Sequence, residues 1–167
     1  HFNYRERYPE TAAFFLPDFP VDAEVKYKDN LMNAYDNSIR YTDNFLARII
    51  HLLKQQQVDA SMLYTSDHGE DIFDDGRHLF LHASPVPSYY QLHVPLLLWT
   101  SDSYREEYPG IEKAASMNRQ KNISSSISFF QTMMELAGIE TPYRNDSLSV
   151  TSPLYTEKSR VYLNDHN

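Results

Sequence analysis

The segment Ala60-Ser61-Met62-Leu63-Tyr64-Thr65-Ser66-Asp67-His68-Gly69-Glu70 decides the fold class of this chain. Its first half, residues 60–65, is short and mostly apolar, which predicts a buried β-strand. Its second half becomes polar at once, and Gly69 gives the backbone the freedom to turn there. Because ligands bind beyond the carboxyl ends of strands in open α/β sheets, the segment predicts a strand with a functional site at its end.

An amphipathic helix is expected before this strand. Apolar residues recur at steps of three and four, which predicts a helix from Asp29 to about Gln55. Tyr35 lies on the apolar stripe and Asp36 on a neighbouring face, so we expect structural roles for both. The preceding residues, 1–28, carry prolines and aromatics without a sustained period, which predicts a long ordered loop.

A second strand and a second helix are expected after the segment. The apolar run from Val94 to Thr100 predicts the strand, and a helix should begin at Asn122 or Ser124 and end before Gly138. The polar stretch between them, up to Lys121, has no clear period and predicts no element. Helices that alternate with short apolar strands predict an α/β sandwich.

The composition limits the partners. The net charge is −8 and the sequence pI is near 5.3, so the chain would repel nucleic acid. It has no cysteine, so any zinc must be held by histidine, carboxylate or hydroxyl groups. No apolar run approaches the ~20 residues that cross a bilayer, so we expect a soluble piece. The chain opens at His1 in a mid-domain pattern, which predicts a single partial domain, 1–167, of a longer protein with any membrane anchor elsewhere.

The adjacent pair Asp67-His68 is the candidate metal site. A carboxylate and an imidazole on neighbouring residues can bind one zinc ion where the backbone turns sharply, and Glu70 could orient His68. The alternative is that both are ordinary turn residues with a solvated imidazole. Further histidines could bring a second ligand to the same edge, although at least one should be a bystander. They are His78, His82 and His93.

Two other groups of side chains leave alternatives open. Asp71, Asp74 and Asp75 form an acidic patch that lacks the ligand ladder and closing glutamate of a calcium loop, so we expect a solvated loop. Tyr89 and Tyr90 could stack on a sugar or pack in the core.

The motifs together resemble the bacterial phosphoethanolamine transferases that modify lipid A and other envelope glycans, a sulfatase-like branch of the alkaline phosphatase superfamily. The Tyr-Asp-Asn helix joined to Ser-Asp-His-Gly-Glu is the more specific part of the resemblance. The matching segments are 30–43, 61–70, Leu81-His82, 94–99, the helix 124–139, and His1 with Arg7-Tyr8-Pro9.

The resemblance implies an α/β/α sandwich of alkaline phosphatase type, of which this chain is the carboxy-terminal portion. Asp67 and His68 match two ligands of the family's catalytic zinc. His1 and His82 match histidines that bind a second zinc or the substrate phosphate, and His78 is a rival to His82 because the gap after Asp67 is long. The nucleophilic threonine and an acidic zinc ligand lie upstream in the family, so no catalytic nucleophile is expected in this chain.

The implied function is metal-dependent transfer of phosphoethanolamine from phosphatidylethanolamine to lipid A or another envelope glycan, through a phosphoenzyme. The parent protein would be anchored in the inner membrane with a periplasmic catalytic domain, and this piece alone would be inactive. A sulfatase or phosphodiesterase of the same superfamily is the alternative, and the upstream nucleophile would distinguish them. A non-catalytic binding domain is the third reading, which predicts no zinc at Asp67-His68.

Overall fold

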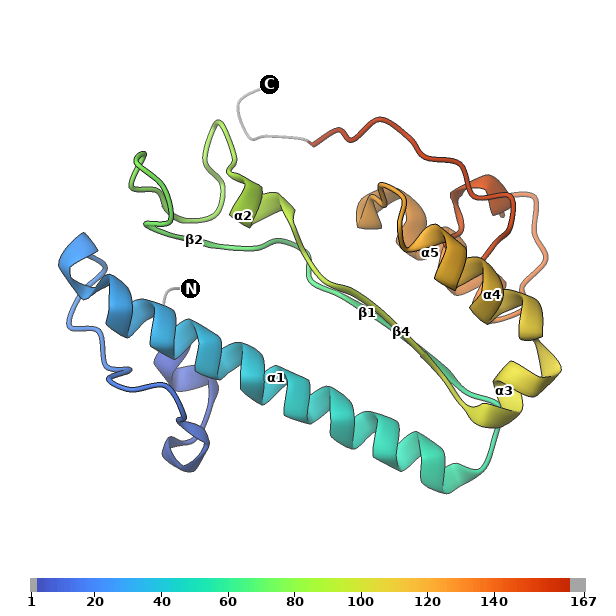
Figure 1. Ribbon diagram of the computed structural model, residues 1–167, viewed down its shortest axis with the longest axis horizontal. Coiled ribbons are helices and arrows are strands. Elements are labelled where there is room, and N and C mark those ends of the chain that lie inside the picture. The colour runs from blue at the N-terminus through green and yellow to red at the C-terminus, as the bar shows by residue number, and fades with distance from the viewer. Residues whose placement is uncertain (1–2, 163–167) are drawn as a thin grey trace. The chain divides into compact units, whose positions relative to one another are not determined.

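The structure, a computed structural model, describes residues 3–162 (Figure 1). Their contacts divide them into two compact units. The first contains residues 3–51 and 66–94, and the second contains residues 52–65 and 95–162. Each unit mixes helices with a pair of short strands, in keeping with an α/β chain.

Helix α1, Lys28–Gln56, confirms the predicted long helix to within a residue at each end. Its buried face differs from the predicted stripe, because the fully covered positions near its start are Leu31, Ala34 and Asn37, while Ile39 is half exposed. The reason is that the N-terminal loop packs on this part of the helix and requires a polar partner there, which the Asn37 amide provides.

The N-terminal loop is ordered, as predicted, and contains short 3-10 helices, η1 Tyr4–Arg7, η2 Glu10–Ala12 and η3 Val25–Tyr27. The fully buried side chain of Asn37 fixes it to α1. Its Oδ1 accepts the backbone N–H groups of Phe14 and Phe15 at 2.9 Å each, and its Nδ2 donates to the Phe15 carbonyl. This double use of one amide satisfies backbone groups that the loop conformation leaves unpaired.

The first unit continues with strands β2, Asp71–Ile72, and β3, Phe80–Leu81, which pair antiparallel, and with helix α2, Tyr89–Leu92. The expectation of a solvated acidic loop is wrong for Asp71, which is 1% exposed. Its carboxylate accepts hydrogen bonds from Ser88 Oγ at 2.6 Å and from the Gln91 amide. A buried carboxylate needs such donors, so Asp71 ties β2 to α2.

The second unit is built on strands β1, Ser61–Thr65, and β4, Leu96–Thr100, which lie side by side and antiparallel with Leu63 opposite Leu98 (Figure 1). Both strands confirm the predicted runs to within two residues. Helix α5, Ser125–Leu136, confirms the predicted second helix, and Gly138 after it has a φ of +63°.

Two further helices in this unit were not predicted. They are α3, Asp102–Glu107, and α4, Pro109–Asn118, and the 3-10 helix η4, Asp146–Leu148, follows α5. Ser101 begins α3 as its N-cap, accepting the N–H of Tyr104. Among the described residues, no helix combines the length and apolar character that a membrane span requires.

Candidate metal centre

The loop that leaves β1 places Asp67 and His68 side by side. The Asp67 side chain is 88% exposed, and its Oδ1 accepts the backbone N–H of His68 at 3.0 Å. Its other oxygen, Oδ2, lies 3.8 Å from Nε2 of His68. Nδ1 of His68 lies 2.9 Å from the Gly69 carbonyl oxygen. If Nδ1 carries the proton and donates it to that carbonyl, Nε2 presents its lone pair on the side of Asp67.

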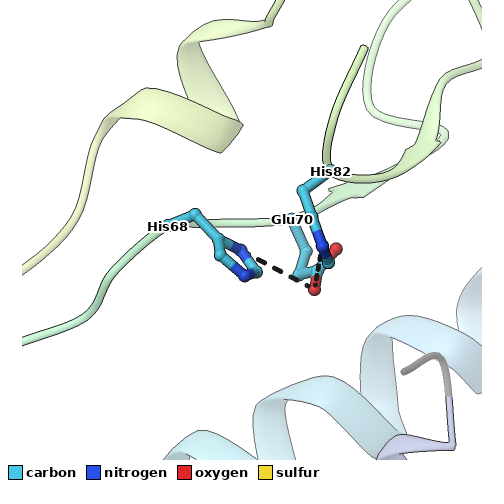
Figure 2. A group of neighbouring side chains, drawn as sticks. All are labelled: His68, Glu70 and His82. Carbon is cyan, nitrogen blue, oxygen red and sulfur yellow. Dashed lines mark hydrogen bonds and ion pairs between the residues drawn. The ribbon is translucent and has the colours of Figure 1, made fainter. Parts of the chain in front are cut away.

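A second set of donor atoms adjoins this pair. Figure 2 shows the side chains of His68, Glu70 and His82 close together, with one oxygen of Glu70 near both imidazoles. Oε1 of Glu70 is 3.0 Å from Nδ1 of His82 and 3.9 Å from Nδ1 of His68. The two imidazole centroids are 3.9 Å apart, and one ligand atom from each of the three residues lies within 4.8 Å of the others.

The β2–β3 hairpin explains how residues so far apart in sequence meet. Asp71 pairs with Leu81 and Ile72 with Phe80, so the register puts Glu70 next to His82 just beyond the paired strands. The same register carries His78 to the tip of the hairpin.

Several residues of this hairpin have a positive φ although they are not glycine. Phe73 has a φ of 56° and Leu81 a φ of 69°, and the N–H of Phe73 donates to the Leu79 carbonyl at 2.9 Å to close the connection. Ala83, just after His82, has a φ of 64°. Such conformations cost free energy and persist where the surrounding structure holds them, often at functional sites.

Gly69 fits closely against helix α2. Its N–H donates to the Gln91 carbonyl at 2.8 Å, and a Cβ at this position would meet the Tyr90 carbonyl oxygen at 1.9 Å. No side chain fits at that distance, so the sequence needs glycine here for close approach. The contact fixes the path of the backbone between the two candidate ligands on either side, His68 and Glu70.

The donor set suits zinc. Two atoms bound to one tetrahedral zinc at about 2.0–2.1 Å lie roughly 3.3 Å apart, and the separation of 3.8 Å between Oδ2 of Asp67 and Nε2 of His68 is of this order. The Glu70 side chain is only 10% exposed, and its Oε2 is buried without a hydrogen-bond partner. A buried carboxylate oxygen of this kind is stabilised by a cation, so the residues present fit the metal.

The potential around Glu70 is negative. Burial raises the pKa of the Tyr4 hydroxyl above its usual range, and the Glu70 carboxylate and the Tyr35 and Asp74 side chains raise it further. All of these groups belong to the first unit. A site in which neighbouring negative charge resists the ionisation of a phenol also attracts positive charge.

The structure brings some of the site residues predicted from the sequence together and leaves others apart. Asp67 and His68 are adjacent, and His82 joins His68 through Glu70, whose shorter contact is with His82 rather than with His68 as expected. His78 is exposed at the hairpin tip and belongs to neither set. His1 lies outside the described residues, and His93 Nδ1 bonds to the Tyr89 hydroxyl at 2.8 Å.

Comparisons with known proteins agree with the fold. A model of the sulfatase family matches residues 1–139. Phosphoethanolamine transferase EptA of Escherichia coli strain K12 is 33% identical over 145 residues, which are 84% of this chain and 26% of that protein. The chain therefore spans about a quarter of the length of such curated relatives.

Solved structures of the same kind also match. The C-terminal periplasmic domain of EptC from Escherichia coli superposes with a TM-score of 0.81 at 27% identity, over 96% of this chain and 45% of that one. Its complex with Zn gives a TM-score of 0.79 at 26% identity, over 95% and 44% of the two chains. The integral membrane protein lipooligosaccharide phosphoethanolamine transferase A from Neisseria meningitidis gives 0.78 at 25% identity, over 88% and 28%.

Proposed function

The chain belongs to the sulfatase family and is homologous to its phosphoethanolamine transferases, and from this premise we propose that it is part of a zinc-dependent enzyme that transfers phosphoethanolamine from phosphatidylethanolamine to lipid A or another envelope glycan. The observation that carries the proposal is the clustering of the buried Glu70 carboxylate with the imidazoles of His68 and His82, with Asp67 adjoining His68. This arrangement offers the ligand types that zinc uses in proteins, at the strand end where an α/β site is expected.

In this proposal, Asp67 and His68 bind the catalytic zinc. The Gly69 carbonyl holds His68 in the orientation that presents Nε2, which is the usual outer-shell support of a zinc-bound imidazole. When bound, zinc would lower the pKa of a nucleophilic hydroxyl and neutralise charge on phosphoryl oxygens. The nucleophile is a threonine supplied from outside residues 1–167.

His82 has a separate role, which is to bind the substrate phosphate or a second zinc ion. Oε1 of Glu70 accepts a hydrogen bond from the Nδ1–H of His82 at 3.0 Å, which leaves Nε2 of His82 available as a ligand. An imidazole held in this way by a carboxylate is oriented and becomes a stronger base or ligand. His1 is proposed for the same role on the strength of the family resemblance alone, and His78 is not needed.

The proposed location follows from the substrates. Phosphatidylethanolamine and lipid A are membrane lipids, so the whole protein would be anchored in the inner membrane and would work in the periplasm. Residues 1–167 would be the carboxy-terminal part of a single α/β/α catalytic domain and would be inactive alone. The homologous EptC domain is periplasmic and the Neisseria relative is an integral membrane protein, which supports this arrangement.

Zinc content and transfer, both measured on the full-length protein, test the proposal. Asp67→Ala and His68→Ala are each expected to lose bound zinc and to abolish transfer of phosphoethanolamine from the lipid. His78→Ala is the matched control, because this histidine is exposed at the hairpin tip and should leave both unchanged.

The alternatives give other results. Zinc binding with hydrolysis of a sulfate ester or phosphodiester, and no transfer from phosphatidylethanolamine, would identify a sulfatase or phosphodiesterase. Zinc content that is indifferent to both alanine substitutions would contradict the assigned ligands, and with no catalysis it would favour a binding domain.

A further inference from the structure

A pocket in the first unit shares Glu70 with the metal centre. It has a volume of about 240 Å³, slightly below the roughly 300–1,000 Å³ of ordinary ligand pockets, and so suits a small group. Its lining combines three carboxylates with three phenol rings. These belong to Asp36, Glu70, Asp74, Tyr35, Tyr89 and Tyr90.

Among the described residues, no lysine or arginine lines this pocket, and the imidazole of His93 is part of its lining. Within residues 3–162, neither Asp36 nor Asp74 nor Glu70 forms an ion pair with a lysine or arginine. Asp74 accepts the backbone N–H of Ile72 at 2.6 Å. Glu70 uses Oε1 for His82 and keeps Oε2 buried without a hydrogen-bond partner, in a side chain nine-tenths covered.

The aromatic side chains add a second feature that favours cations. Tyr89 is 65% exposed and Tyr90 is 44% exposed, so the expectation that they could pack in the core is wrong. Their rings meet edge to face at 5.9 Å, and Tyr89 is held by its hydroxyl bond to His93. The faces of phenol rings attract ammonium and guanidinium groups, most strongly where water is partly excluded.

We propose that this pocket binds a primary ammonium group of the substrate, with the carboxylates of Asp36, Glu70 and Asp74 as its counter-charges. The inference rests on the proposed function and extends it. Glu70 contacts His82 on one side and lines the pocket on the other, so a phosphate held at the histidines would have its ethanolamine arm beside the carboxylates. The raised pKa of Tyr4, caused by burial and then by Glu70, is consistent with the negative potential there.

Two substrates could supply the ammonium group. One is the headgroup of the donor lipid, and the other is a free amine on the acceptor glycan. Both would be recognised by the same carboxylates and rings, so the experiment has to vary the donor and the acceptor separately.

The test is donor discrimination by the full-length protein. Phosphatidylethanolamine is compared with a matched donor in which a hydroxyl replaces the amine. Asp36→Asn and Asp74→Asn are each expected to lower kcat/KM for the amine donor about tenfold, which is typical for loss of a charge-assisted contact, and to leave kcat/KM for the hydroxyl donor unchanged. Asp43→Asn is the control, because Asp43 is an exposed residue of the same helix outside the pocket.

The possible outcomes are distinct. If kcat/KM falls only for an acceptor with a free amine, and not for the N-acetylated acceptor, the result supports the pocket and assigns its ammonium group to the glycan. An equal fall for all donors and acceptors, with zinc content unchanged and no loss of stability, overturns the inference and leaves the transferase function standing. A wild-type protein that transfers from no ethanolamine lipid overturns the proposed function, and the inference with it.

Discussion

Oε1 of Glu70 lies 3.0 Å from Nδ1 of His82, although the two residues are 12 positions apart in the chain. The antiparallel register of β2 and β3 produces this contact, since it continues from the pairs Asp71 with Leu81 and Ile72 with Phe80. The hairpin therefore places His82 beside the loop that carries His68. The length of the hairpin can vary at its tip without disturbing the contact.

Glu70→Gln should weaken metal and phosphate binding while preserving the shape of the side chain. The amide keeps the size of the side chain but removes the charge that supports His82, and outer-shell changes of this kind cost about 10–100-fold in metal affinity. Zinc affinity of the full-length protein, measured by competition with a chelator, checks this. Glu140→Gln, at an 85% exposed position, is the control and should leave affinity unchanged. Equal affinity for the Glu70 variant and wild type would remove Glu70 from the site.

Gly69→Ala should destabilise the protein and displace the candidate ligands. The added Cβ would meet the Tyr90 carbonyl oxygen at 1.9 Å, and because that oxygen is a backbone atom it cannot move aside alone. We expect a loss of about 1–3 kcal/mol in the free energy of unfolding, typical of overpacking, together with reduced zinc binding. Gly76→Ala is matched to it, because nothing lies within 4 Å of its Cβ. Denaturant unfolding of both variants measures the difference, and similar losses would contradict the close contact.

Asn37→Ala should loosen the N-terminal loop. The change removes three hydrogen bonds at once, those of Asn37 with the N–H groups of Phe14 and Phe15 and with the Phe15 carbonyl, and each such bond contributes about 0.5–1.5 kcal/mol. We expect a loss of about 2–4 kcal/mol and faster hydrogen exchange at those two amides. Asn44→Ala, at an exposed position of the same helix, should change neither quantity. Unaltered exchange in the Asn37 variant would show that the loop is held by other contacts.

Asp36→Asn should make the protein more stable at neutral pH. Partial desolvation of its carboxylate raises the pKa of Asp36 in the folded state, so the wild type is stabilised below the unfolded pKa, about 3.9, and loses that contribution as pH rises through the folded pKa. The asparagine variant escapes this loss. The difference in unfolding midpoint between variant and wild type should therefore be positive at pH 7 and vanish below about pH 4. A difference that is independent of pH would exclude the ionisation of Asp36 as its cause.

The sequence allowed prediction of elements that are long or strongly patterned. The step of three and four residues located α1 to within one residue at each end, and the polar turn after residues 61–65 located the site loop. Helix α3 was missed because six residues are too few to show a helical period, and α4 was missed because the stretch up to Lys121 is polar without a clear period, although proline, here Pro109, is favoured at a helix start.

Non-local contacts limited the prediction of the site. The contact between Glu70 and His82 depends on the hairpin register and on left-handed backbone at Phe73 and Leu81, neither of which is a residue that signals such a conformation. Likewise, nothing in the sequence around Asp71 shows that Ser88 and Gln91 would cover it. These features are set by tertiary packing, which a local pattern does not contain.

The contact of Gly69 with helix α2 has a consequence for how this protein could change its substrate. Backbone atoms of Tyr90 and Gln91 make that contact, while the side chain of Tyr90, with that of Tyr89, lines the neighbouring pocket. If this pocket binds the ammonium group as proposed, substitutions of those two side chains would change the preferred headgroup without moving the strand-end loop that carries His68. Recognition and catalysis would then be free to evolve at different rates within one short stretch of chain.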